Sequence, residues 1–141
     1  MKQLIVLAAV LPLLLVFMMQ YTLDQKNQDA ISALQQQVYT AKEQARQAGC
    51  FTEEIKSQLR SRINTTLGIP EKDIVIAATE TPRYRMNTFG ETVERGMIHY
   101  RVSIPLDKLM AGNRMFGIKD EDNKTVYTVE GVAASERLPA Y

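Results

Sequence analysis

Residues 4–19 read LIVLAAVLPLLLVFMM, sixteen consecutive residues without a charged side chain. Extended to Leu23, the stretch has twenty residues, or about 30 Å of helix at about 1.5 Å per residue, which matches the hydrocarbon core of a bilayer. A soluble helix that is apolar on every side needs a large core around it, and a chain of 141 residues is too short to supply one. The sequence therefore predicts a transmembrane anchor over residues 1–23.

A cleavable signal peptide is the alternative interpretation of this segment, because Met1 and Lys2 followed by an apolar run open such a peptide in the same way. The run is at or just above the usual length of a signal's hydrophobic region. Residues 18–21, MMQY, also lack the small residues of a cleavage site. We therefore expect a retained anchor.

The charges that flank the apolar run predict its orientation. Lys2 and the α-amino group precede it, whereas Asp24, Lys26 and Asp29 follow it. Since positive charge stays on the cytoplasmic side, we expect a single-pass protein with a cytoplasmic N-terminus and an extracytoplasmic C-terminal domain. Pro12 removes one backbone hydrogen bond within the span and predicts a kink or a locally loosened helix.

The helix is expected to continue beyond the membrane. No Gly or Pro interrupts residues 13–48, eight Gln lie between Gln20 and Gln47, and Gly49 offers a stop. Apolar side chains recur there with alternating spacings of three and four, which is typical of a narrow heptad seam. The seam consists of Ile31, Leu34, Val38, Ala41, Ala45 and Ala48. Residues 24–49 are thus predicted to form an amphipathic helical extension.

Two interpretations of this long helix remain open. In the first it is an assembly spine, whose apolar half packs in a bundle and whose seam docks on partners or on the chain's own domain. The bundle residues would be Leu4, Leu7, Val10, Leu11, Pro12, Leu14, Phe17 and Met18. In the second it is a membrane stalk with a single seam that the chain's own domain covers.

Residues 50–141 are predicted to form a small exported α+β domain. A second, short helix begins at Thr52-Glu53-Glu54, where a hydroxyl cap precedes two acids, and it ends at Gly68. Its cationic residues, Lys56 included, are interpreted as a solvated face. Three strands follow, at residues 73–79, 97–104 and 124–135, and Pro105 is expected to close the second.

Burial of one sheet face against the helices gives a small antiparallel three-stranded sheet as the simplest arrangement. In the second strand, Ile98, Tyr100, Val102 and Ile104 share one face and His99 lies on the other. The connections are predicted as a hairpin arm or mobile loop at 80–96, a short helical turn or apolar-tipped loop at 106–117, and a turn at 120–123.

The composition points away from catalysis and from nucleic acid. The formal net charge is only +1, so nucleic acid is not the default partner. His99, the one histidine, has no accompanying nucleophile motif. Cys50, the one cysteine, is interpreted as a packed side chain, with an intermolecular disulfide or labile thiol as the alternative. Residues 120–123, DEDN, lack the spacing of a calcium loop. We expect no enzyme, cofactor or metal site.

The layout resembles that of type IV pilin-like proteins, with an apolar N-terminal helix, a proline within the membrane, an amphipathic extension and a small sheet domain. The run Leu11-Pro12-Leu13-Leu14-Leu15-Val16-Phe17 is more specifically similar to the start of TadE-like pseudopilins. Such proteins commonly carry a Gly before the apolar run and a Glu five residues into the mature chain. Here residue 5 is Ile and no Gly precedes it, so the peptidase site is absent.

This resemblance implies assembly outside the cell. The expected function is a structural subunit of an extracellular pilus-like filament, whose partners are the membrane, further copies of itself and pilus or secretion assembly proteins. The alternative is a single-pass membrane-anchored binding or assembly component of a secretion or conjugation machine, with loops 80–96 and 106–118 contacting a partner.

Overall fold

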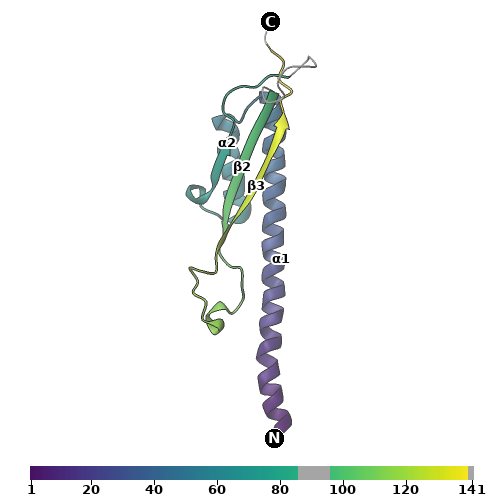
Figure 1. Ribbon diagram of the computed structural model, residues 1–141, viewed down its shortest axis with the longest axis vertical. Coiled ribbons are helices and arrows are strands. Elements are labelled where there is room, and N and C mark those ends of the chain that lie inside the picture. Colours follow the sequence, from purple (N-terminus) through teal and green to yellow (C-terminus); the bar gives the residue numbers. More distant parts are fainter. Residues whose placement is uncertain (86–95, 140–141) are drawn as a thin grey trace. The chain divides into compact units, whose positions relative to one another are not determined.

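The computed structural model describes residues 1–85 and 96–139 (Figure 1). Its elements are α1 (Lys2–Ala48), α2 (Glu53–Leu67), the 3₁₀ turn η1 (Glu71–Asp73), β1 (Val75–Ala78), β2 (Met97–Leu106), the 3₁₀ turn η3 (Asn113–Phe116) and β3 (Thr125–Ala134). The predicted α+β class is confirmed, with a long apolar N-terminal helix, a second helix and a three-stranded antiparallel sheet. The predicted arm at 80–96 falls mostly on residues outside the described ranges.

The chain divides into two compact units, and α1 contributes to both. The first unit comprises Met1–Ile31 with Leu106–Val126, and the second comprises Ser32–Pro105 with Tyr127–Tyr141. The first therefore contains the apolar part of α1 and the loop between β2 and β3. The second contains the rest of α1, all of α2 and most of the sheet.

The C-terminal end of α1 lies at Gly49, as predicted. Gly49 has a φ of +89°, and its N–H donates to the Ala45 carbonyl at 2.7 Å. A Cβ added here would lie 2.5 Å from the carbonyl oxygen of Arg83 and 2.8 Å from Cδ of Arg137. Both the backbone angle and the crowding therefore require glycine.

Helix α2 begins and ends where its sequence signals lie. The Thr52 hydroxyl accepts a hydrogen bond from the Ile55 N–H at 3.2 Å, and Gly68 ends the helix with a φ of +68°. The interpretation of Lys56 as part of a solvated face is wrong, because this side chain is buried. Its ammonium lies 2.6 Å from a carboxylate oxygen of Glu53 and 2.5 Å from one of Glu80. These two hydrogen bonds, first Glu53 and then Glu80, raise the pKa of Lys56.

The sheet has the order β1-β2-β3. Strands β1 and β2 pair antiparallel, with Val75 opposite Ser103. Between β2 and β3, Arg101 bonds to Glu130 and Ser103 bonds to Thr128, so partners advance in opposite directions and this pair is antiparallel as well.

The second unit has one apolar core, formed by the inner sheet face, α2 and the C-terminal part of α1. Its buried side chains include Leu34, Val38, Phe51, Ile55, Leu59, Ile63, Ile74, Ile98, Val102 and Ile104. The predicted alternation of β2 is confirmed, since Ile98, Val102 and Ile104 are buried while His99 and Arg101 are exposed.

Two strand boundaries differ from the prediction. Strand β1 begins at Val75 rather than at residue 73, because the chain first makes the η1 turn after Pro70. Strand β2 continues through Pro105 instead of closing there. The His99 carbonyl accepts the Thr79 N–H, so the odd-numbered residues of β2 direct their backbone groups toward β1. Because β1 begins opposite Ser103, the nitrogen of Pro105 needs no strand partner.

Candidate functional site

The apolar part of α1 is the most unusual surface of the described chain. All eight predicted bundle residues are exposed: Leu4, Leu7, Val10, Leu11, Pro12, Leu14, Phe17 and Met18. Phe17 is 71% exposed and Leu4 67% exposed. The most apolar eighteen-residue window of α1 has no buried residue, and this helix is long and apolar enough to cross a membrane. A soluble core helix would be covered, so this surface is suited to lipid or to other apolar helices.

The side chains of the predicted seam, unlike the bundle residues, are buried or half-buried. Leu34, Val38, Ala41 and Ala45 are buried in the second unit, whereas Ile31 and Ala48 are half-buried at its two ends. The central seam positions are therefore covered by the chain's own residues. Both interpretations of the long helix allow the chain's own domain to cover the seam, and this arrangement leaves those four side chains unavailable to a partner.

A polar pin joins the apolar part of α1 to the loop of the first unit. The Gln20 amide nitrogen donates to the Leu109 carbonyl at 3.0 Å, and its amide oxygen accepts the Ala111 N–H at 2.8 Å. About two helical turns further along, Asn27 donates to the Lys108 carbonyl at 2.9 Å. The sequence analysis did not predict this contact. Gln20 could have indicated it, because it is the first uncharged polar side chain after the apolar run and such a side chain needs a hydrogen-bond partner.

The loop between β2 and β3 carries its own internal hydrogen bonds. The buried Asn123 side chain accepts the Met110 N–H at 2.8 Å and donates to the Met110 carbonyl at 3.0 Å. Asn113 donates to the Ile118 carbonyl and to an Asp120 carboxylate oxygen, both at 2.9 Å. These bonds satisfy part of the non-helical backbone of the loop, which lowers the cost of placing it in an apolar environment.

Asp120 belongs to this internal network and does not act as an open cation ligand. Hydrogen bonds from Arg114 and then Asn113 lower the pKa of Asp120 from 3.8 to about 2. Residues 120–123 form the predicted turn. Within residues 1–85 and 96–139, no group of three or more His, Cys, Asp or Glu side chains is placed to hold a metal ion.

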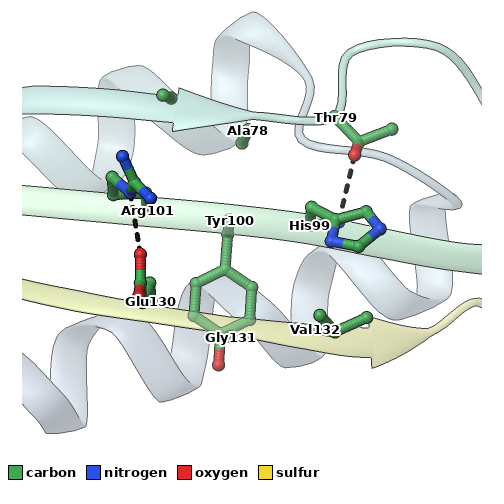
Figure 2. A pocket seen from close by; sticks show the side chains of 9 residues that line it. Ala78, Thr79, His99, Tyr100, Arg101, Glu130, Gly131 and Val132 are labelled. Atoms are coloured by element: carbon green, nitrogen blue, oxygen red, sulfur yellow. Dashed lines mark hydrogen bonds and ion pairs between the residues drawn. The ribbon is translucent and has the colours of Figure 1, made fainter.

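The outer face of the sheet forms a shallow depression that contains the one histidine (Figure 2). Across it, Arg101 Nε lies 2.8 Å from a Glu130 carboxylate oxygen. Thr79 Oγ1 accepts the main-chain N–H of His99 at 3.0 Å, so this hydroxyl bonds to the backbone and not to the imidazole. The arrangement gives His99 no activated nucleophile among the described residues.

Beneath this face, Tyr100 lies across Gly131 of the neighbouring strand (Figure 2). A Cβ on Gly131 would lie 2.5 Å from the Tyr100 hydroxyl oxygen, and the ring of Tyr100 lies 5.9 Å from that of Phe51. The glycine makes room for an aromatic side chain that covers the core. This pair therefore has a packing role.

Cys50 is a free thiol and is only 5% exposed. It lies between the end of α1 and the buried Phe51. Its burial favours the packed role over an intermolecular disulfide, because disulfide formation needs access to the sulfur.

Comparisons with protein-family models, with curated proteins and with solved structures find no match to this chain.

Proposed function

We propose that this protein is a non-enzymatic, single-pass membrane subunit that assembles through its apolar helix into a pilus-like extracellular filament. The observation that carries the proposal is that all eight predicted bundle residues are exposed, in a helix long enough to span a bilayer. Lipid and neighbouring helices are similar environments for Leu and Val, so one surface serves both the membrane state and a helical bundle.

The second unit supports a role as a solvent-facing domain. Its seam and inner sheet face are buried in one core, and its outer sheet face carries charged and hydroxyl side chains. Such a domain remains folded whether α1 lies in lipid or in a bundle. Self-association would then depend on the apolar part of α1.

Cysteine cross-linking of the full chain tests the filament. In a Cys50→Ser background, single cysteines replace Leu7, Leu11 and Leu14, which lie on one face of α1 at helical spacing. A bundle that uses this face gives strong dimer bands at all three positions, and electron microscopy of sheared surface material shows filaments containing the chain. Exposed Thr40, changed to Cys, is the control outside the apolar part.

A discrete membrane-anchored assembly component is the second candidate, and the buried seam favours it. With Leu34 and Ala45 both 0% exposed, the heptad positions offer no docking stripe for neighbours. Weak cross-linking without helical period, together with discrete particles and no filaments, would support this candidate and reject the first.

Orientation and retention are tested separately. Lys2→Glu, with Lys2→Arg as control, is expected to weaken insertion with the N-terminus in the cytoplasm. Normal topology of the Lys2→Glu protein would contradict the charge argument. N-terminal sequencing of the membrane-bound protein tests the anchor itself, and recovery of a soluble chain lacking the apolar run would establish a removed signal.

A further inference from the structure

We propose that the loop 107–124 is a membrane foot, which inserts the apolar tip formed by Leu109, Met115 and Phe116 into the interface of the bilayer that α1 spans. This inference rests on the proposed membrane anchor. It adds a second lipid contact and a device that sets the depth of the helix.

The position of the loop along α1 carries the argument. A Cβ added at Gly112 would lie 3.8 Å from Cγ2 of Val16, so the loop backbone passes beside that residue. Val16 precedes Leu23, the outer end of the predicted span, by seven residues, or about 10 Å of helix at about 1.5 Å per residue. The loop thus reaches the depth at which interfacial segments bury their apolar side chains, about 5–10 Å.

The exposed side chains of the loop fit this environment. Met115 is 71% exposed, the adjacent Phe116 54% and Leu109 39%. The described residues cover these side chains only in part, and they belong to the same unit as an apolar helix whose own surface is exposed. One bilayer would cover both the apolar tip of the loop and the apolar part of α1, because the tip lies beside the proposed span.

A groove between α1 and the loop is lined partly by apolar and partly by charged side chains, as a lipid interface requires. It has a volume of about 830 Å³. Leu15, Met19 and Leu23 line it from the helix, with Met110 and Ala111 from the loop, and charged side chains that include Lys26 and Lys108 line the rest. Acyl chains can contact the apolar lining residues, and lipid headgroups can contact the charged ones.

The polar groups that join the loop to α1 are hydrogen-bonded to one another. Gln20 places a polar amide within the apolar segment, and the loop backbone bonds to both its nitrogen and its oxygen. Asn123 satisfies the backbone of Met110 in turn. Removing these groups from water therefore leaves no orphaned donor in the pin.

The charges of the loop identify the kind of lipid. Between residues 107 and 124 there are four basic and four acidic side chains, so the net charge of the loop is zero. Apolar insertion, rather than attraction to anionic headgroups, must then drive the contact. We expect it to occur in vesicles of phosphatidylcholine alone and to be insensitive to salt.

The experiment uses the full chain, which contains no tryptophan. Phe116→Trp is reconstituted into phosphatidylcholine vesicles with brominated acyl chains, which quench only lipid-embedded tryptophan. Emission at short wavelength with strong quenching is expected. Leu14→Trp reports insertion of α1. Tyr39→Trp is the water control, because Tyr39 lies on α1 sixteen residues beyond Leu23, about 24 Å further along.

The outcomes separate the foot from the anchor. Quenching of Leu14→Trp without quenching of Phe116→Trp overturns the foot and leaves the anchor intact. Absence of quenching at both sites overturns the two proposals together. A Phe116→Trp emission that is short in wavelength but unquenched, and that depends on the protein-to-lipid ratio, assigns the tip to a second copy of the chain and also overturns the lipid contact.

Gln20→Ala tests the pin in the same assay. Loss of its two hydrogen bonds to the loop backbone is expected to reduce quenching of Phe116→Trp and to leave Leu14→Trp unchanged. Full retention of the Phe116→Trp signal would contradict the role of Gln20 in holding the foot at its depth.

Discussion

The two parts of α1 form one uninterrupted helix, but the apolar side chains of the first are exposed and those of the second are buried by the chain's own residues. Leu14 is 54% exposed, whereas Leu34 is fully buried by the second unit. The first part, residues 4–23, is apolar on all sides and is called the bare part below. The second, residues 24–48, has a single apolar stripe and is called the covered part. The number of apolar faces, rather than the presence of leucine, thus decides whether a helical segment is covered by its own chain or needs an environment beyond it.

The largest effect is expected from shortening a leucine in the covered part. Leu34→Ala should lower the free energy of unfolding of the second unit by about 3–4 kcal/mol, because it opens a cavity in the core. Leu14→Ala is the matched control and should leave that unfolding free energy unchanged. Denaturant unfolding in detergent micelles measures both, and equal losses would break the distinction between the two parts.

A charge in the bare part should act on the membrane instead. Leu11→Lys should cost about 3 kcal/mol of insertion free energy, which is roughly a hundredfold in the ratio of inserted to uninserted chain. Thr40→Lys, at an exposed position of the covered part, should have no effect. Flotation with vesicles measures the ratio, and full insertion of the Leu11→Lys protein would refute a lipid-facing role.

The end of α1 should be less tolerant than the end of α2. Gly49→Ala combines a positive φ with a close approach to Arg83, so it should cost at least about 2 kcal/mol of unfolding free energy. At Gly68 a Cβ meets nothing within 4 Å, so Gly68→Ala should cost only about 1 kcal/mol, from backbone strain alone. Thermal unfolding compares the two variants, and a larger loss for Gly68→Ala would contradict the crowding argument.

Acid should loosen the loop beside the bare part by protonating Asp120. The folded-state pKa of Asp120 lies below its ordinary value, so its contribution is present above 3.8 and disappears as the pH falls toward about 2. Hydrogen exchange at the Ile118 amide, which bonds to the Asn113 carbonyl, should accelerate across this window. In Asp120→Asn that acceleration should vanish, and its persistence would assign it to another group.

The smallest effect is expected on the outer sheet face. The side chains of Arg101 and Glu130 are 65% and 60% exposed, so Arg101→Ala should change the unfolding free energy by less than about 1 kcal/mol. Any change should shrink at high salt. A loss that is larger and independent of salt would mean that this face is covered by something in the assembled protein.

The sequence predicted those features that depend on local chemistry. The extent of α1 beyond Pro12 followed from the absence of Gly and Pro in residues 13–48, and the two faces of β2 followed from alternation. Pro105 was read as a strand end because its neighbour on the β1 side was unknown. Lys56 was read as solvated because Glu80, which completes its cover, lies twenty-four residues away.

In the candidate site, too, the features encoded by neighbouring residues were predictable and the contacts between distant residues were not. The composition of the apolar run is enough to predict a segment able to span a membrane. The contact between Gln20 and the loop joins residues eighty-nine and ninety-one positions apart, and no periodicity encodes such a pair. Only the folded chain brings these polar groups to the same place.

The closure of α1 by distant residues has a consequence for biosynthesis. The last carbonyls of the helix are bonded by late parts of the chain, since the Glu136 N–H donates to the Arg46 carbonyl and the Arg137 guanidinium donates to that of Ala48. In the proposed topology, a nascent chain that emerges on the far side of a membrane would lack these donors until almost all of it had been translocated. In the proposed topology the second unit would therefore complete its fold only after passage, and the chain would stay unfolded while it is being transported.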